Sequence, residues 1–235
     1  MDRKACHFVP IQRTTIIESM HVLIFAGGSV QPGKAVTQAI DTADLVIAAD
    51  TGADTALSYG CVPAIVVGDF DSLTIPLQQL EELGSQIIRV AAEKDDTDTE
   101  LAIEVALERG ATSITLLGGL GGVRFDHSIA NILLLAGYET VPLRIVDGPA
   151  TCWLLRGPGG TDIYGQSGDL LSLFPLTASA SGIHTHNLYY PLHGETLNFG
   201  KPRGISNVLT ADHAQVTLEQ GMLLVVHTTV LDLHE

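Results

Sequence analysis

Short apolar runs alternate with amphipathic segments through the first 140 residues. Each run is rich in Val, Ile and Leu and short enough to predict a buried strand. The predicted strands are 21–28, 44–50, 64–69, 85–91 and 113–119, and the predicted helices are 33–43, 52–60, 76–84, 97–110 and 126–137. In the clearest helix Thr97 and Glu100 form a capping box and Gly110 supplies the stop. This alternation predicts a parallel sheet with flanking helices on both faces.

The pattern changes after about residue 145. Strand-like runs at 152–157, 168–176, 182–192 and 215–227 are broken by Gly, Pro and Asn, without a strong helical period. They predict a C-terminal all-β sandwich domain. The predicted fold class is therefore α/β, with an N-terminal parallel sheet and flanking helices plus this sandwich. The predicted units are an N-terminal extension at 1–19, an α/β domain at 20–145 and the sandwich at 146–235.

Composition restricts the partners. The chain has 235 residues, 46% of them hydrophobic, and its 12 Lys and Arg against 27 Asp and Glu give a net charge of −15. Such an acidic surface argues against nucleic acid and anionic membranes, but not against a nucleotide carried by Mg²⁺. No apolar run approaches the roughly 20 residues that span a bilayer. Cys6, Cys61 and Cys152 are far apart in the sequence, so we expect a soluble, cytoplasmic protein without a disulfide framework.

Acidic residues and glycines follow several of the predicted strands. Asp50, Asp69 and the loop 118–122 stand at strand ends, and ligands bind outside the carboxyl ends of parallel strands. In "GDFDS" an extended backbone would point Asp69 and Asp71 to one side and Phe70 to the other. Two neighbouring carboxylates repel each other, which favours a cation between them. An ordinary solvated turn is the alternative.

Two further stretches carry charge beside a helix start. "EKDDTDTE" (93–100) contains Asp95, Asp96 and Asp98, more acids than capping of one helix requires, and Lys94 beside them could contact a phosphate. "LLGGLGGVRFDHSIAN" (116–131) joins a glycine-rich loop to Arg124, Asp126 and His127. Glycines let the backbone approach a phosphate, a helix start favours anions, and arginine is a forked donor.

Two other patterns are weaker. "GSVQPGKA" (28–35) nearly matches a P-loop, but Ala35 stands where the metal-binding hydroxyl is needed. His184 and His186 would share one face of a strand, either as a metal pair without an evident third ligand or as part of an exposed strand face.

The order of "AADTGA", "GDFDS", "KDDTDTELA", "GGLGGVRFDH", "YPL" and "GISN" resembles the thiamine pyrophosphokinase family over about residues 21–226. The resemblance implies an α/β nucleotide-binding catalytic domain, a β-sandwich domain for thiamine binding and dimerisation, and a homodimer. It implies transfer of the pyrophosphoryl group of ATP to the hydroxyl of thiamine, giving thiamine diphosphate and AMP. The implied cofactor is Mg²⁺, with ATP as co-substrate.

The resemblance also implies roles for individual residues. Metal ligands would be Asp69, Asp71, Asp95 and Asp98; the ATP side would comprise Asp50, Lys94, Gly118, Gly119, Arg124, Asp126 and His127; the thiamine side would comprise Ser206, Asn207 and Tyr190. Asp71, Asp98 and Arg124 would be catalytic, with either aspartate accepting the hydroxyl proton. Two alternatives stay open: a pyrophosphokinase for another hydroxymethyl compound such as a pterin, and a non-catalytic nucleotide-binding module.

The chain departs from the family pattern in four places. Thr51 stands where a glycine is usual, and Val123 separates the glycine pair from Arg124. Asn187 replaces a glycine before "LYYPL", and Val208 follows "GISN" where an acid is common. The first two departures concern contacts to the nucleotide, and the last two concern contacts to thiamine.

Overall fold

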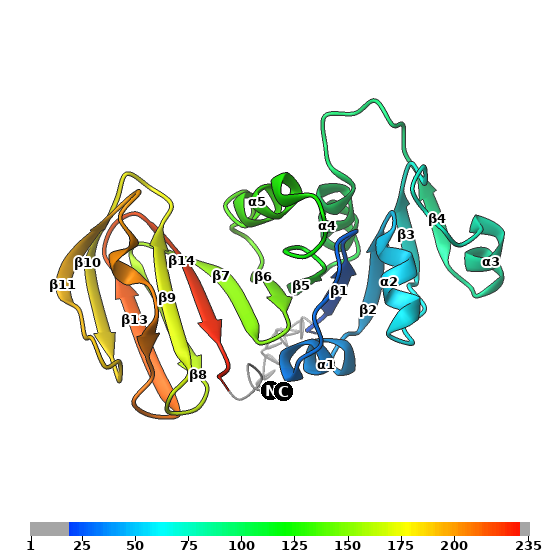
Figure 1. Cartoon of the computed structure of the whole chain (residues 1–235). Helices are drawn as coiled ribbons and strands as arrows, with labels where there is room; N and C mark the ends of the chain where they lie inside the picture. The colour runs from blue at the N-terminus through cyan, green and yellow to red at the C-terminus, as the bar shows by residue number, and fades with distance from the viewer. Residues whose placement is uncertain (1–18, 231–235) are drawn as a thin grey trace, which may run out of the picture.

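Two β-sheets and five α-helices make up the structure, a computed structural model that describes residues 19–230 (Figure 1). In chain order the elements are β1 (His21–Phe25), α1 (Lys34–Asp41), β2 (Leu45–Ala49), α2 (Gly52–Ser58), β3 (Ile65–Gly68), α3 (Leu77–Glu82), β4 (Gln86–Arg89), α4 (Asp98–Glu108), β5 (Ser113–Leu117), α5 (Phe125–Leu134), β6 (Leu143–Asp147), β7 (Ala150–Arg156), β8 (Gly159–Tyr164), β9 (Leu170–Pro175), β10 (Ser179–His186), β11 (His193–Asn198), the 3₁₀ helix η1 (Pro202–Gly204), β12 (Asn207–Val208), β13 (His213–Leu218) and β14 (Met222–Thr228).

The N-terminal part is a parallel sheet in the order β6-β5-β1-β2-β3-β4. β1 lies inside it, paired with β2 on one side and β5 on the other. The chain first adds strands outward from β1 to β4 and then returns to the other side of β1 with β5. Where the strand order reverses, a crevice forms between the loop that follows one neighbouring strand and the loop that follows the other.

Helices cover both faces of this parallel sheet (Figure 1). Val22 and Ile24 of β1 pack in the same cluster as the buried Ile103 of α4, whereas Leu23 and Phe25 pack in the cluster that contains residues of α1 and α2. Alternate side chains of a strand point to opposite faces, so a strand covered on both faces must be apolar throughout. The continuous apolar run of β1 follows from this burial.

The large sheet continues from the N-terminal part into the C-terminal part. β6 turns back into the antiparallel strand β7, and β14, β9 and β12 extend the same sheet, which has ten strands in all. A second sheet, in the order β11-β10-β13-β8, packs over this extension (Figure 1). Leu171, Leu223 and Val225 of the large sheet share a buried cluster with Ile183 and Val216 of the small one. This is a β-sandwich.

The predicted fold class is confirmed, with differences in detail. β6 was not among the predicted strands, and the predicted boundary between residues 145 and 146 falls inside it. The division into domains stays a prediction, and residues 1–18 of the predicted extension lie outside the described residues. The run predicted at 215–227 forms two strands, because Gly221 adopts a φ of 94° between them. β8 and β11 were not predicted, because their sequences contain few apolar residues.

Two expectations from composition concern cysteines and membranes. Cys61 and Cys152 are free thiols, and Cys6 lies outside the described residues. Across residues 19–230 no helix combines the length and the apolar character that crossing a bilayer requires.

Packing between α4 and the sheet gives a prediction about stability. Ile103 is fully buried, and Ile103→Ala should lower the free energy of unfolding by about 2–5 kcal/mol, because it removes buried methyl groups and leaves a cavity. Glu108→Ala, on the exposed side of the same helix, is the control and should change it by less than about 0.5 kcal/mol. Urea unfolding followed by circular dichroism measures both. Equal effects would contradict the burial of this face of α4.

Candidate active site

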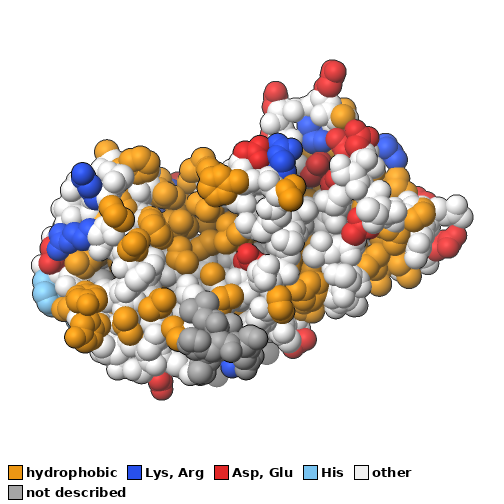
Figure 2. All heavy atoms as spheres, viewed as in Figure 1, with side chains coloured by type: hydrophobic (Ala, Val, Ile, Leu, Met, Phe, Trp, Pro, Cys, Tyr) orange, Lys and Arg blue, Asp and Glu red, His pale blue; other side chains and the backbone are white. Residues whose placement is uncertain are grey.

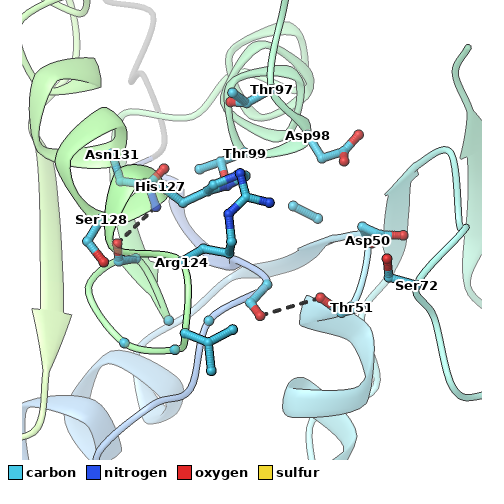
Figure 3. Close-up of a pocket in the computed structure, with 18 of the residues that line it drawn as sticks. Asp50, Thr51, Ser72, Thr97, Asp98, Thr99, Arg124, His127, Ser128 and Asn131 are labelled. Carbon is cyan, nitrogen blue, oxygen red and sulfur yellow. Dashed lines mark hydrogen bonds between the residues drawn. The ribbon is translucent and has the colours of Figure 1, made fainter. Parts of the chain in front are cut away.

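A pocket of about 430 Å³ lies at the carboxyl ends of the parallel strands (Figure 3). The loops that follow β1, β2, β3, β4 and β5 all contribute to its lining. Figure 3 shows Asp50 and Asp98 on one side of it, and Arg124 and His127 at the start of α5 on the other. The crevice expected from the reversal of strand order is therefore present.

Three carboxylates meet on the acidic side of the pocket. Asp50 follows β2, Asp69 follows β3 and Asp98 is the first residue of α4. Each offers a carboxylate oxygen, and these oxygens all lie within 4.8 Å of one another. Around an octahedral Mg²⁺ with oxygens at about 2.1 Å, neighbouring ligands are roughly 3 Å apart and opposite ligands roughly 4 Å apart. These hard oxygen donors therefore suit a small divalent cation if they draw closer together around it.

The hydrogen bonding of this group also suits a cation. The Oδ1 atom of Asp50 is buried and accepts no hydrogen bond from any described residue. Asp98 Oδ1 is also buried, and its near neighbour is the Lys94 ammonium at 3.1 Å, without a well-aligned hydrogen bond. Buried polar atoms are almost always paired, so the unpaired oxygen of Asp50 indicates a place where a ligand completes the structure.

Burial and crowding raise the pKa of Asp50 above its ordinary value. Partial burial is the larger cause, and the charges of Asp98 and Asp69 add to it, while the backbone N–H groups of Thr51 and Phe70 act in the opposite direction. Asp50 also adopts a left-handed backbone, with φ 46°, which costs energy for a residue other than glycine. The structure thus holds this carboxylate in an environment that disfavours its charge.

Lys94 supplies positive charge to the acidic side. Its Nζ lies 3.1 Å from Asp98 Oδ1 and 3.8 Å from Asp69 Oδ2. It also donates a hydrogen bond to the carbonyl oxygen of Ala91 at 3.1 Å. The side chain is only 17% exposed. The lysine predicted on the nucleotide side therefore lines the pocket with its ammonium directed to the carboxylates.

Asp71 and Asp95, two of the predicted metal ligands, are not part of this group. Both are exposed, and neither belongs to the three-carboxylate set or to the pocket lining. The expectation that Asp69 and Asp71 share one face of an extended segment is wrong. Phe70 has a φ of 68°, and the backbone N–H of Asp71 donates to Asp69 Oδ1 at 3.1 Å. This side-chain turn closes the segment and directs the two carboxylates differently.

Two glycine-containing loops pack backbone against backbone on the floor of the pocket. The N–H of Gly28, after β1, donates to the carbonyl oxygen of Gly118, after β5, at 3.1 Å. A Cβ atom on Gly28 would collide with the carbonyl oxygens of Gly118 and Gly121. Asn131 of α5 donates to the Gly119 carbonyl oxygen at 2.9 Å, which ties the second loop to the helix (Figure 3). The close packing of the two loops requires glycine at position 28, independently of any need for a phosphate to approach the backbone.

Arg124 and Asp126 form an ion pair at the start of α5. Arg124 Nε donates to Asp126 Oδ1 at 3.0 Å, and Nη2 donates to Oδ2 at 2.7 Å. These hydrogen bonds from Arg124 lower the pKa of Asp126 to about 2. Arg124 and His127 line the pocket, whereas Asp126 does not. Both members of the pair are largely exposed, so Arg124 can exchange the carboxylate for an anion in the pocket.

The predicted thiamine-side residues lie on the sandwich and not in the pocket lining. Asn207 Oδ1 accepts from the N–H of Tyr190 at 2.9 Å, and its Nδ2 donates to the carbonyl oxygen of Tyr190 at 2.7 Å. The N–H of Ser206 donates to Ser172 Oγ at 3.0 Å. The motifs "YPL" and "GISN", far apart in the sequence, are therefore joined through one asparagine side chain.

Several lining residues were not assigned a binding role from the sequence: Gly27, Gly28, Ser72, Asp96, Thr99, Ser128 and Asn131. Gly27 and Gly28 end the predicted strand 21–28, and glycines at a strand end are a signal for a ligand-binding loop. Thr99, Ser128 and Asn131 are buried polar residues of helices, and their part in the pocket depends on where the helices pack.

Comparison with known proteins identifies the family. The family model "Thiamin pyrophosphokinase, catalytic domain" matches residues 36–146, and "Thiamin pyrophosphokinase, vitamin B1 binding domain" matches residues 161–223. A thiamine pyrophosphokinase of Bacillus subtilis (strain 168) is 31% identical over 210 residues, which cover 88% of this chain and 97% of that relative. The chain belongs to the thiamine pyrophosphokinase family. The resemblance proposed from its motifs is confirmed.

Solved structures agree with this assignment. The crystal structure of thiamine pyrophosphokinase from Bacillus subtilis superimposes with a TM-score of 0.78 at 29% identity, covering 89% of this chain and 99% of that one. That of thiamin pyrophosphokinase from Geobacillus thermodenitrificans gives 0.74 at 26% identity, covering 89% and 98%.

Two departures from the family pattern have a structural explanation. Thr51 has a φ of −58°, so its backbone does not need the freedom of glycine. Asn187 has a φ of 58°, in the left-handed region where asparagine is the best tolerated substitute for glycine. Each residue is therefore compatible with the backbone conformation that it adopts.

The raised pKa of Asp50 gives a prediction about the pH dependence of stability. Because the folded state favours the protonated carboxyl group, ionisation of Asp50 lowers the stability of the fold. This penalty is absent below the ordinary pKa of 3.8, grows as the pH rises from there to the folded-state pKa, and is complete above it. In the presence of EDTA, Asp50→Asn should raise Tm by about 1–4 °C at pH 7. The gain should shrink as the pH is lowered toward 4. Differential scanning calorimetry tests this, and a lower Tm for Asp50→Asn at pH 7 would contradict it.

Proposed function

We propose that this protein transfers the pyrophosphoryl group of ATP to the hydroxyl of thiamine, giving thiamine diphosphate and AMP. The observation that carries the proposal is the meeting of Asp50, Asp69 and Asp98 in a pocket with two glycine loops, in a chain that matches both domains of the family. In this reaction the hydroxyl oxygen attacks the β-phosphorus, the bond from that phosphorus to the α–β bridging oxygen breaks, and AMP leaves with the electron pair.

We assign the metal role to Asp69 and Asp98, with Asp50 completing the group. Mg²⁺ bound there would neutralise charge on the phosphate oxygens. Asp71 and Asp95, predicted for the same role, lie outside the group, and their part in metal binding stays a prediction. Of the two carboxylates predicted to accept the hydroxyl proton, Asp98 lines the pocket and Asp71 does not, so we assign that proton to Asp98.

The opposite wall of the pocket suits the phosphates. The backbone of Gly118 and Gly119 leaves room for close approach, and Arg124 and His127 stand at the start of α5 (Figure 3). A helix start favours anions, and a guanidinium can bind two phosphate oxygens at once. We propose that Arg124 stabilises the charge that develops on the departing phosphate, while Asp126 orients Arg124 from outside the pocket.

A second copy of the chain would bring thiamine to this pocket. Phe125, Ile129 and Leu133, four residues apart on α5, are 76%, 44% and 56% exposed, and Tyr189 and Tyr190 are exposed on the sandwich. Figure 2 shows apolar side chains gathered between the sandwich and the α/β part. Large apolar patches mark interaction sites. We propose a cytoplasmic homodimer in which Ser206, Asn207 and Tyr190 of one subunit bind thiamine beside the pocket of the other.

The direct test measures both products by chromatography. Purified protein with ATP, thiamine and Mg²⁺ should form AMP and thiamine diphosphate in equal amounts, and excess EDTA should stop both. A hydroxymethylpterin in place of thiamine should give no AMP above the rate without acceptor. AMP formation with the pterin but not with thiamine would identify a different pyrophosphokinase. ATP binding without AMP formation in the presence of any acceptor would identify a non-catalytic module.

Replacing single aspartates separates the metal ligands. Asp98→Asn should lower kcat by at least about 100-fold, because it removes a charge from the metal group while keeping the shape of the side chain. Asp71→Asn is predicted to do the same if Asp71 joins the group when substrates bind. Steady-state kinetics with circular dichroism of each variant measures this. Near-normal turnover of folded Asp71→Asn would exclude Asp71 from the mechanism, and near-normal turnover of Asp98→Asn would overturn the metal assignment.

Replacing the guanidinium tests the phosphate wall. Arg124→Ala should raise the KM for ATP about tenfold or more and change the KM for thiamine much less, because it removes a charge-assisted contact to phosphate. Asp126→Ala is the companion variant, which frees Arg124 without removing it, and should have the smaller effect on ATP. A larger effect of Arg124→Ala on thiamine than on ATP would contradict the assignment.

A further inference from the structure

Lys94 is the cation that the structure places among the pocket carboxylates. Its Nζ is 3.1 Å from Asp98 Oδ1 and 3.8 Å from Asp69 Oδ2, and these two residues belong, with Asp50, to the group that can hold a metal ion. The ammonium therefore lies close to where a divalent cation would contact the same two carboxylates. Two cations that close would repel each other strongly in a partly buried site.

The contacts of Lys94 place its ammonium beside the carboxylates but leave the side chain able to move. It donates one further hydrogen bond, to the Ala91 carbonyl oxygen at 3.1 Å within the same loop. The side chain is a flexible stem with a compact charge and makes no bidentate fork. The lining of the same pocket also includes the glycine loops and Arg124. A displaced ammonium thus has phosphate-binding surroundings to move to.

We propose that Lys94 is an internal counter-ion that competes with the divalent cation for Asp69 and Asp98 and moves to the nucleotide phosphates when the metal enters. The inference rests on the proposed function, since it takes the carboxylate group as the metal site. It assigns Lys94 two opposite effects. Lys94 weakens binding of the free metal ion, and it strengthens binding of the nucleotide once the metal is in place. A lysine with only a structural or only a phosphate-binding role would not produce both.

The experiment uses Mn²⁺ as a spectroscopic probe and Lys94→Gln as the variant. Without nucleotide, Lys94→Gln should bind Mn²⁺ about tenfold more tightly than the unmodified protein, because the competing charge is gone. Binding is read from the electron paramagnetic resonance signal of free Mn²⁺. Lys201→Gln, an exposed lysine in the sandwich region, makes the same change in net charge and should leave Mn²⁺ binding within about twofold, because distant surface charges are screened.

The second arm measures the nucleotide with saturating Mn²⁺. α,β-Methylene ATP, whose α–β linkage cannot be cleaved, should bind Lys94→Gln about tenfold more weakly, as expected for the loss of one charge-assisted hydrogen bond. Lys94→Met keeps the stem without the charge and should repeat both results if Lys94→Gln folds poorly. The opposite signs of the two effects support the inference.

Asp69→Asn separates failure of this inference from failure of the proposed function. Loss of Mn²⁺ binding in Asp69→Asn, with equal Mn²⁺ binding by Lys94→Gln and the unmodified protein, would overturn the role of Lys94 and leave the metal site intact. Weaker Mn²⁺ binding by Lys94→Gln than by the unmodified protein would also overturn the role of Lys94. Mn²⁺ binding that does not depend on Asp69, or that is undetectable in every variant, would overturn both the inference and the metal assignment. Thiamine diphosphate formation is scored independently of these outcomes.

Discussion

The parallel pairing of β1 with β2 on one side and with β5 on the other is the constraint on which the pocket depends. Because the paired strands run in one direction, their carboxyl ends reach the same edge of the sheet and their loops converge there. Burial on both faces, through Ile24 toward α4 and Phe25 toward α1 and α2, keeps the strands from shifting. The close contact between Gly28 and Gly118 is possible only with this register.

Gathering several carboxylates at this edge of the sheet lowers the stability of the fold, and the buried sheet holds them in place against their mutual repulsion. Asp50 is held in a left-handed backbone conformation with a raised pKa, and its buried Oδ1 accepts no hydrogen bond from the described residues. Such strain and unmet hydrogen-bonding capacity are characteristic of functional sites. The ammonium of Lys94 offsets part of the repulsion. The site is therefore arranged around a positive charge, whichever group supplies it.

The ten-stranded sheet runs without a break from the α/β part, which contains the pocket, into the sandwich. β6 belongs to the parallel half, and it turns directly into β7, which opens the antiparallel half. No flexible linker separates the two, so the sandwich is carried by the same hydrogen-bonded ladder that positions the pocket. On the sandwich, Asn207 holds the backbone of Tyr190, so the family motifs "YPL" and "GISN" act as one structural unit.

Local sequence determined the alternation of strands and helices, the change to an all-β pattern, and the acids and glycines at strand ends, because period, capping and turn chemistry are encoded within a few residues. The family motifs extended this to the reaction. Tertiary structure alone decided that Asp50 joins Asp69 and Asp98 while Asp71 turns away, since the direction of a side chain depends on the turn at Phe70 and on which strands are neighbours. It also decided that β6 joins the two halves and that Lys94 lies beside Asp69, because strand pairing and the ion pair between these two residues act between positions distant in the chain.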